Sequence, residues 1–158
     1  MSEDGQPVDE RGATIEGIVA QAQSLAEDDL WDQAHAMLTQ ALDEHGDDPL
    51  LLTWTGLAAQ RVGEEGEAFE MFRRALGMQP QDPFVLASAG SGLAALDDPE
   101  AERALRLAAL TAPGFPFARA AYGAYLAREG LFEDAIAELT AARDLAPEDG
   151  SVHAELGM

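Results

Sequence analysis

The run GSGLAA (90–95) matches the pattern G-x-G-x-x-A, in which glycines let a backbone approach the pyrophosphate of a dinucleotide. Such a site requires a strand before the glycines, a helix that opens on them and an acidic residue about 20 residues further on. Counting about 20 residues from Gly92 reaches Pro113, which is not acidic. Gly90 also fits a helical repeat, so we expect a helix here and no nucleotide site.

Other residues that could do chemistry lack the spacing that the chemistry requires. His35, His45 and His153 show neither H-x-x-x-H nor E-x-x-H, the spacings that place two metal ligands on one helical face. Neighbouring carboxylates such as Asp97 and Asp98 recur at expected turns and helix starts, where negative charge favours a helix N-terminus. Acid–base catalysis instead needs two carboxylates in contrasting environments. We therefore expect no enzyme, no catalytic residue, no metal and no cofactor.

Composition and charge narrow the possible partners. The chain has 158 residues, 47% of them hydrophobic, which is enough for one folded domain. It carries 30 acidic and 9 basic residues, for a net charge of −21, and every basic residue is arginine. Nucleic acids and anionic lipids bind through Lys and Arg, so we expect neither as a partner. The charge is typical of a solubility coat or of salt adaptation, and it would also steer a basic partner.

The start of the chain and its cysteine content favour a cytoplasmic protein. No apolar run approaches the ~18–20 residues of a membrane helix. The first residues, MSEDGQPVDERGAT, are acidic and lack the basic start and apolar core of a secretory signal. With no cysteine, disulfides, thiolate metal sites and a cysteine nucleophile are excluded.

One period of about 34 residues organises the chain. Glycines recur with spacings of 34, 33 and 34, and so do alanines that open the second half of each unit; the two series are Gly56, Gly90, Gly123, Gly157 and Ala34, Ala68, Ala101, Ala135. Each period reads as two helices, and a single pair cannot bury its apolar face alone. The small glycine predicts a close approach of the two helices of one pair, with Ala68 or Ala135 meeting it. Aspartate followed by proline is typical of a helix start and occurs at Asp48, Asp82 and Asp98. The helices predicted in this way are 14–27, 31–44, 49–61, 65–77, 83–95, 98–110, 116–128, 132–145 and 151–157.

The pattern resembles the tetratricopeptide repeat (TPR), whose signature is W-x2-L-G-x2-Y, then A-x3-F, then P over 34 residues. The resemblance covers the repeats 15–48, 49–82, 83–115 and 116–149. It implies an all-α, right-handed helical solenoid over 14–158. Residues 1–13, which are acidic and precede the first expected helix, are predicted to be a disordered lead-in. Residues 150–158 restart the pattern, either as a terminal capping helix or as the start of a further repeat in a longer protein.

The repeats depart from the signature in places. The Trp slot holds Ile18, Leu52, Leu86 and Arg119, and we expect Arg119 to snorkel or to face solvent. The third repeat lacks one residue near its inner turn, around 96–98.

In this family the first helix of each repeat lines a concave groove, which the resemblance implies for this chain as well. Moving one residue along a helix turns about 100° around its axis, so the residues next to the core-facing positions are the ones expected in the groove. They are Leu50, Thr53, Trp54, Leu57, Arg61, Phe84, Ala87, Ser88, Ser91, Phe117, Ala120, Ala124 and Arg128. Small apolar side chains beside Trp, Phe and Arg suit an extended segment or an amphipathic helix. Phe84, Phe117 and Trp54 have an alternative role as packing residues between or within repeats.

The sequence therefore predicts a non-catalytic scaffold or adaptor that binds a basic or apolar protein segment. TPR adaptors that bind chaperone tails resemble one another in a basic clamp for a carboxylate, and the corresponding positions here hold no Lys or Arg. One alternative is a chaperone of the bacterial secretion type, suggested by the run GFPFARAAYGAYLAREGLFEDA. A regulatory domain of an enzyme is another alternative. An apolar groove also makes self-association an expected property.

Overall fold

The computed structural model describes residues 14–146, and all regular structure in that range is α-helical. The helices are α1 (Ile15–Glu27), α2 (Trp31–His45), α3 (Pro49–Arg61), α4 (Glu65–Gly77), α5 (Pro83–Ala94), α6 (Glu100–Thr111), α7 (Pro116–Arg128) and α8 (Phe132–Leu145). Each begins and ends within two residues of the expected range, which confirms the all-α class. The expected lead-in over 1–13 and the expected helix over 151–157 lie outside the described residues.

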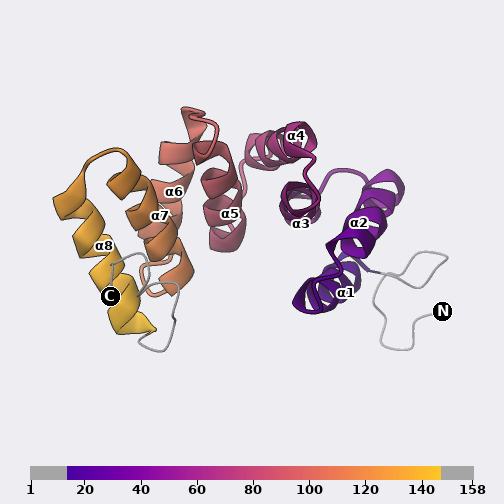
Figure 1. Ribbon diagram of the computed structural model, residues 1–158, viewed down its shortest axis with the longest axis horizontal. Coiled ribbons are helices and arrows are strands. Elements are labelled where there is room, and N and C mark those ends of the chain that lie inside the picture. The colour runs from indigo at the N-terminus through magenta and orange to yellow at the C-terminus, as the bar shows by residue number, and fades with distance from the viewer. Residues whose placement is uncertain (1–13, 147–158) are drawn as a thin grey trace. The chain divides into compact units, whose positions relative to one another are not determined.

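The chain divides into two compact units between Ala75 and Leu76. Unit 1 contains α1, α2, α3 and nearly all of α4, which are the first two repeats. Unit 2 contains α5 to α8, the third and fourth repeats. Within each unit, consecutive helices lie against each other, and the first helices of neighbouring repeats also touch (Figure 1).

Aspartates set the starts of α3 and α5 as expected. The Asp48 side chain accepts hydrogen bonds from the Leu50 and Leu51 N–H groups at 3.0 Å, and Pro49 is the first helical residue. Asp82 accepts from the Phe84 N–H at 2.8 Å. These bonds satisfy N–H groups that have no partner inside the helix.

The third aspartate–proline pair behaves differently from the prediction. Asp98 accepts from the Glu100 N–H at 2.9 Å, but Pro99 lies at the N-cap, so α6 begins at Glu100 rather than at Asp98. The residue missing from the third repeat explains the shift. In the other repeats the buried alanine donates to the carbonyl four residues back, as Ala34 does to Leu30. Ala101 donates to Asp98, only three residues back, so the first turn is tighter.

The turn inside each repeat has one backbone geometry. A residue with positive φ follows each first helix, and the next N–H donates to the carbonyl five residues back, as in a Schellman motif. The positive-φ residues are Asp29 (60°), Gly63 (88°), Asp97 (57°) and Gly130 (82°). The corresponding bonds are Leu30 to Leu25, Glu64 to Ala59, Asp98 to Leu93 and Leu131 to Leu126. The accepting carbonyls belong to the four residues that align with the tyrosine of the TPR signature W-x2-L-G-x2-Y, namely Leu25, Ala59, Leu93 and Leu126.

In the second, third and fourth repeats the slot glycine lies against a large side chain of the second helix. A Cβ on Gly56 would lie 2.6 Å from Phe72, one on Gly90 would lie 3.0 Å from Leu105, and one on Gly123 would lie 2.7 Å from Leu139. The predicted close approach is therefore confirmed. The nearest atoms to the glycine position belong not to Ala68 or Ala135 but to the longer side chain one turn beyond, Phe72 or Leu139.

Each unit has its own apolar cluster. In unit 1 it contains Ile18, Ala22, Ala34, Leu38, Ala41, Leu51 and Ala58. In unit 2 it contains Leu86, Ala87, Ala104, Ala108 and Ala118. Arg119, in the Trp slot of the fourth repeat, does not simply face solvent: its Nε donates to the Pro113 carbonyl at 2.7 Å, and its guanidinium pairs with Glu138 at 2.7 Å. The arginine thus ties α7 to α8 and to the preceding turn.

Candidate interaction faces

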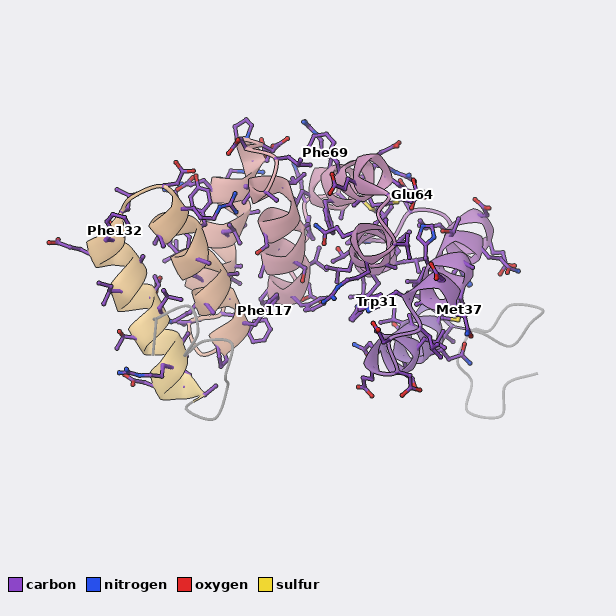
Figure 2. The ribbon with its side chains drawn as sticks, viewed as in Figure 1. Trp31, Met37, Glu64, Phe69, Phe117 and Phe132 are labelled. Carbon is purple, nitrogen blue, oxygen red and sulfur yellow. The ribbon has the colours of Figure 1, made fainter. Side chains whose placement is uncertain are left out.

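Three phenylalanines form the most prominent feature of the expected face in unit 2. The ring centroids of Phe84 and Phe117 are 5.9 Å apart, and those of Phe115 and Phe117 are 5.8 Å apart. Helix starts position them: Asp82 caps α5 just before Phe84, and Pro116 opens α7 between the other two rings. Phe117 is 41% exposed and is labelled in Figure 2. An exposed aromatic ring held by two other rings is a preorganised contact for an apolar side chain.

The rest of this face runs along α5 and α7. Ser91 is exposed, and Ala120 and Ala124 are half-buried. At the far end Arg128, itself exposed, donates from its guanidinium to the Ala94 carbonyl at 2.9 Å, which joins the ends of the two helices. The face therefore offers rings at one end, small side chains in the middle and a cation at the other end.

Two further expected residues of unit 2 have almost no accessible surface. Ala87 is fully buried and belongs to the apolar cluster, and Ser88 is 4% exposed. They lie beneath the face and support it, because they offer a partner almost no surface to contact.

The expected residues of unit 1 come from α3. Leu50 and Leu57 are half-buried, and Trp54 is half-buried and packs against the apolar cluster. The Arg61 guanidinium lies 5.2 Å from the centre of the Trp31 ring, a cation–π geometry (Trp31 is labelled in Figure 2). Thr53 is fully buried, and its hydroxyl donates to the Pro49 carbonyl at 2.7 Å, which satisfies it within the helix.

Sequence reasoning missed two residues of these faces. Phe115 lies at the N-cap of α7, outside the helical rotation that selected the others, although the spacing Phe-Pro-Phe was visible. Trp31 opens α2, a second helix, and the rotation was applied only to first helices. The signal that could have found Trp31 is the arginine at the end of the following first helix, Arg61.

No protein-family model and no curated protein sequence matches the chain. Solved structures do. TTC0263, a thermophilic TPR protein of Thermus thermophilus, matches with a TM-score of 0.72 and 22% identity, over 89% of this chain and 78% of that one. YrrB, described as a TPR protein with an unusual peptide-binding site, matches with a TM-score of 0.67 and 19% identity, over 90% and 74%. MamA of Desulfovibrio magneticus RS-1 matches with a TM-score of 0.68 and 22% identity, over 89% and 80%.

The chain has the tetratricopeptide-repeat fold. At these identities the likeness is one of fold. It agrees with the glycine and alanine slots and with the repeated inner turn described above.

In this TPR fold the glycine-rich run 90–95 has no phosphate-binding geometry. Gly90 and Gly92 are buried inside α5, where backbone N–H groups serve the helix. Across residues 14–146, no group of three or more acidic or histidine side chains is placed to hold a metal ion. In the same range, no helix is long and apolar enough to cross a membrane.

Some of the paired charged residues lie within one helix, as Arg106 and Glu102 do in α6, and others connect different elements. In unit 1 His35 of α2 pairs with Glu67 of α4, and Arg74 of α4 pairs with Asp47 in the turn between the repeats. The hydrogen bond to Asp47 raises the pKa of Arg74 above its ordinary value. These pairs link α4 to α2 and to the turn before α3.

Proposed function

We propose that this chain is a non-catalytic interaction scaffold that holds a peptide or helical segment of a partner protein on the faces formed by its first helices. The observation that carries the proposal is the cluster of Phe84, Phe115 and Phe117, with one ring exposed beside a strip of small side chains. An apolar anchor of a partner can pack on Phe117 without displacing core residues. The fold neighbours include a TPR protein described as having a peptide-binding site, which supports the same class of function.

We expect the partner segment to be soluble and to carry an apolar anchor, with an acidic or carbonyl group nearby that contacts an arginine of the face. Arg128 and Arg61, both exposed, end the first helices of the fourth and second repeats. The surrounding negative charge of −21 disfavours strongly acidic partners and favours a basic region outside the anchor.

The test is affinity capture from the source lysate with wild type, Phe117→Ala, Ser91→Glu and the control Leu110→Ala, at low and high salt. Phe117 and Ser91 belong to the face, whereas Leu110 is 71% exposed on α6, a second helix. Circular dichroism first establishes that all four proteins are equally helical. We expect the same partner to be retained by wild type and by Leu110→Ala and lost from the other two.

A partner that all variants retain at low salt and that high salt releases would place binding on the acidic surface and reject the face. Partners are then mapped by synthetic overlapping peptides, and fluorescence anisotropy gives their affinities. An isolated peptide that binds wild type and not Phe117→Ala establishes segment recognition rather than a whole-domain interface.

A further inference from the structure

Two apolar side chains stand exposed on the first turns of α8. Phe132 is 64% exposed and Ile136 is 59% exposed. They are four residues apart in a helix and so share one face. Figure 2 labels Phe132 at the beginning of α8. With Ala127, at the end of α7, they define what we name the terminal face.

The same positions in the first repeat contact the repeat that follows. Phe132 and Ile136 lie three residues before and one residue after the buried Ala135. The corresponding residues around Ala34 are Trp31 and His35. Arg61 of the second repeat stacks on the Trp31 ring, and Glu67 of the second repeat pairs with His35.

The third repeat repeats this relationship in unit 2. Counted from the buried Ala101, the residues at the same distances are Asp98 and Glu102, although the missing residue also places Asp98 at the turn position of Leu131. Asp98 lines a cleft together with Tyr125 and Glu129 of the fourth repeat. Burial, and then the charge of Glu102, raise the pKa of Tyr122 in the fourth repeat, so Glu102 also faces that repeat.

The end of the first helix provides one more contact between the third repeat and the repeat that follows it. Ala94, at the end of α5, is 5% exposed, and its carbonyl accepts the bond from Arg128 of the fourth repeat. Its counterpart 33 residues later is Ala127, which is only half-buried. Ala26, the counterpart in the first repeat, is also half-buried, so the exposure of Phe132 and Ile136 is what marks the terminal face as open.

We propose that the terminal face binds an amphipathic helix of a partner protein that carries an arginine or lysine beside its apolar stripe. The basic residue is required because Arg61 and Arg128, which occupy equivalent positions in their repeats, both contact the preceding repeat. Arg61 lies on the Trp31 ring, and Arg128 donates to the Ala94 carbonyl. The terminal face offers the equivalent ring, Phe132, and the equivalent carbonyl, Ala127. Three exposed carboxylates lie just before α8 and in its first turn and complement a cation; they belong to Glu129, Glu133 and Asp134. This surface lies outside the faces of the proposed function and does not depend on them.

A second copy of this chain fits the terminal face poorly. In its first repeat the residue equivalent to Arg61 is Glu27, and the residue equivalent to Glu67 is Gln33. Stacking that repeat on the terminal face would bring Glu27 towards Phe132 and the three carboxylates. The charge pattern therefore favours a basic helix over a second copy.

The experiment uses the whole chain and a fluorescent helical peptide of about 15 residues, roughly four turns, with leucines one turn apart and two arginines at the end of the stripe. One control peptide replaces the arginines by glutamates, and another scrambles the order so that the leucines no longer share a face. The proteins are wild type, Phe132→Ser with Ile136→Ser, and Leu110→Ser. Leu110 is 71% exposed on α6 and controls for loss of an exposed apolar side chain. Anisotropy measures binding, and light scattering measures oligomeric state.

We expect the arginine peptide to bind wild type and Leu110→Ser equally and to bind the double variant at least about tenfold more weakly. Neither control peptide should bind comparably, and all proteins should melt at similar temperatures. Equal binding by the scrambled peptide would overturn the proposal in favour of unspecific attraction to an acidic protein.

Two other occupants would also overturn it. A wild-type dimer that the double variant abolishes would assign the face to a second copy. Absence of peptide binding, together with a lower melting temperature of the double variant, would assign it to the chain's own residues after 146.

Discussion

The ring of Phe72 occupies the space where a side chain of residue 56 would begin, since a Cβ on Gly56 would lie 2.6 Å from Cε1 of that ring. Phe72 is 1% exposed, so the ring has little room to move aside. A Cβ added to Gly66, in the next helix, would have no atom within 4 Å. Packing therefore requires the first glycine and not the second.

We expect Gly56→Ala to destabilise the protein and Gly66→Ala to stabilise it. Overpacking at residue 56 costs about 1–3 kcal/mol, which exceeds the gain in helix propensity of about 1 kcal/mol. Gly66→Ala keeps only the gain of about 0.5–1 kcal/mol. Urea unfolding followed by circular dichroism gives both values. A Gly56→Ala variant as stable as Gly66→Ala would refute close packing at this slot.

The helices and the small-residue slots could be predicted because periodicity and capping residues are local signals. Arg119 could not be placed, because its partners Pro113 and Glu138 are brought near only by packing of α7 against α8. Phe72 was missed as the neighbour of Gly56, because repeat position alone does not tell how far a long side chain extends towards the neighbouring helix.

The candidate faces were predictable to a smaller extent. A helical rotation identifies which side of α3 or α5 a residue is on, but it does not give depth. Thr53 and Ser88 therefore passed as face residues although both are buried. The Phe84–Phe117 contact follows from the repeat register, whereas Phe115 joins the rings from a turn whose geometry no periodicity describes.

Position 63 tests the repeated inner turn. Gly63 has a φ of 88°, and Asp29 and Asp97 occupy the same turn position in other repeats. Gly63→Ala should cost about 1–2 kcal/mol, because a Cβ opposes the left-handed conformation. Gly63→Asp should cost less, because a short polar side chain can hydrogen-bond locally there. Thermal unfolding should rank wild type above Gly63→Asp and Gly63→Asp above Gly63→Ala; the reverse order of the two variants would contradict the prediction.

Arg119 and Glu138 replace an apolar pair. The corresponding residues are Ile18 with Met37 in the first repeat and Leu52 with Met71 in the second. Arg119→Leu leaves the mostly buried Glu138 without its cation and should cost about 1–3 kcal/mol. Adding Glu138→Met should recover most of that loss, since the double variant restores the pair of the other repeats. A double-mutant cycle measures the coupling, and strictly additive effects would rule it out.

Alkaline pH should destabilise the fold through its two tyrosines. Burial, and then the charge of Glu102, raise the pKa of Tyr122; burial, and then the charge of Glu129, raise that of Tyr125. The folded state therefore holds these protons more tightly than the unfolded state, whose tyrosines titrate near pH 10. The contribution of the two tyrosines to the free energy of unfolding is therefore complete below about pH 10, and it is lost as the pH rises through their pKa values in the folded state.

Tyrosinate absorbance measures this directly, because the chain has only two tyrosines. We expect both to ionise at higher pH in the native protein than in urea, and Tyr122→Phe to reduce the loss of stability. Coincident titration curves in the two states would contradict the prediction.

The boundary between the two compact units falls between Ala75 and Leu76, inside α4. Repeat proteins unfold as chains of coupled segments, and the coupling between segments decides whether they melt together. We expect the first two repeats and the last two to unfold as separate blocks, because each forms its own compact unit. Heat capacity and amide exchange should therefore follow a few-state scheme rather than a single all-or-none transition, and one melting temperature would average two quantities that a mutation in either block shifts separately.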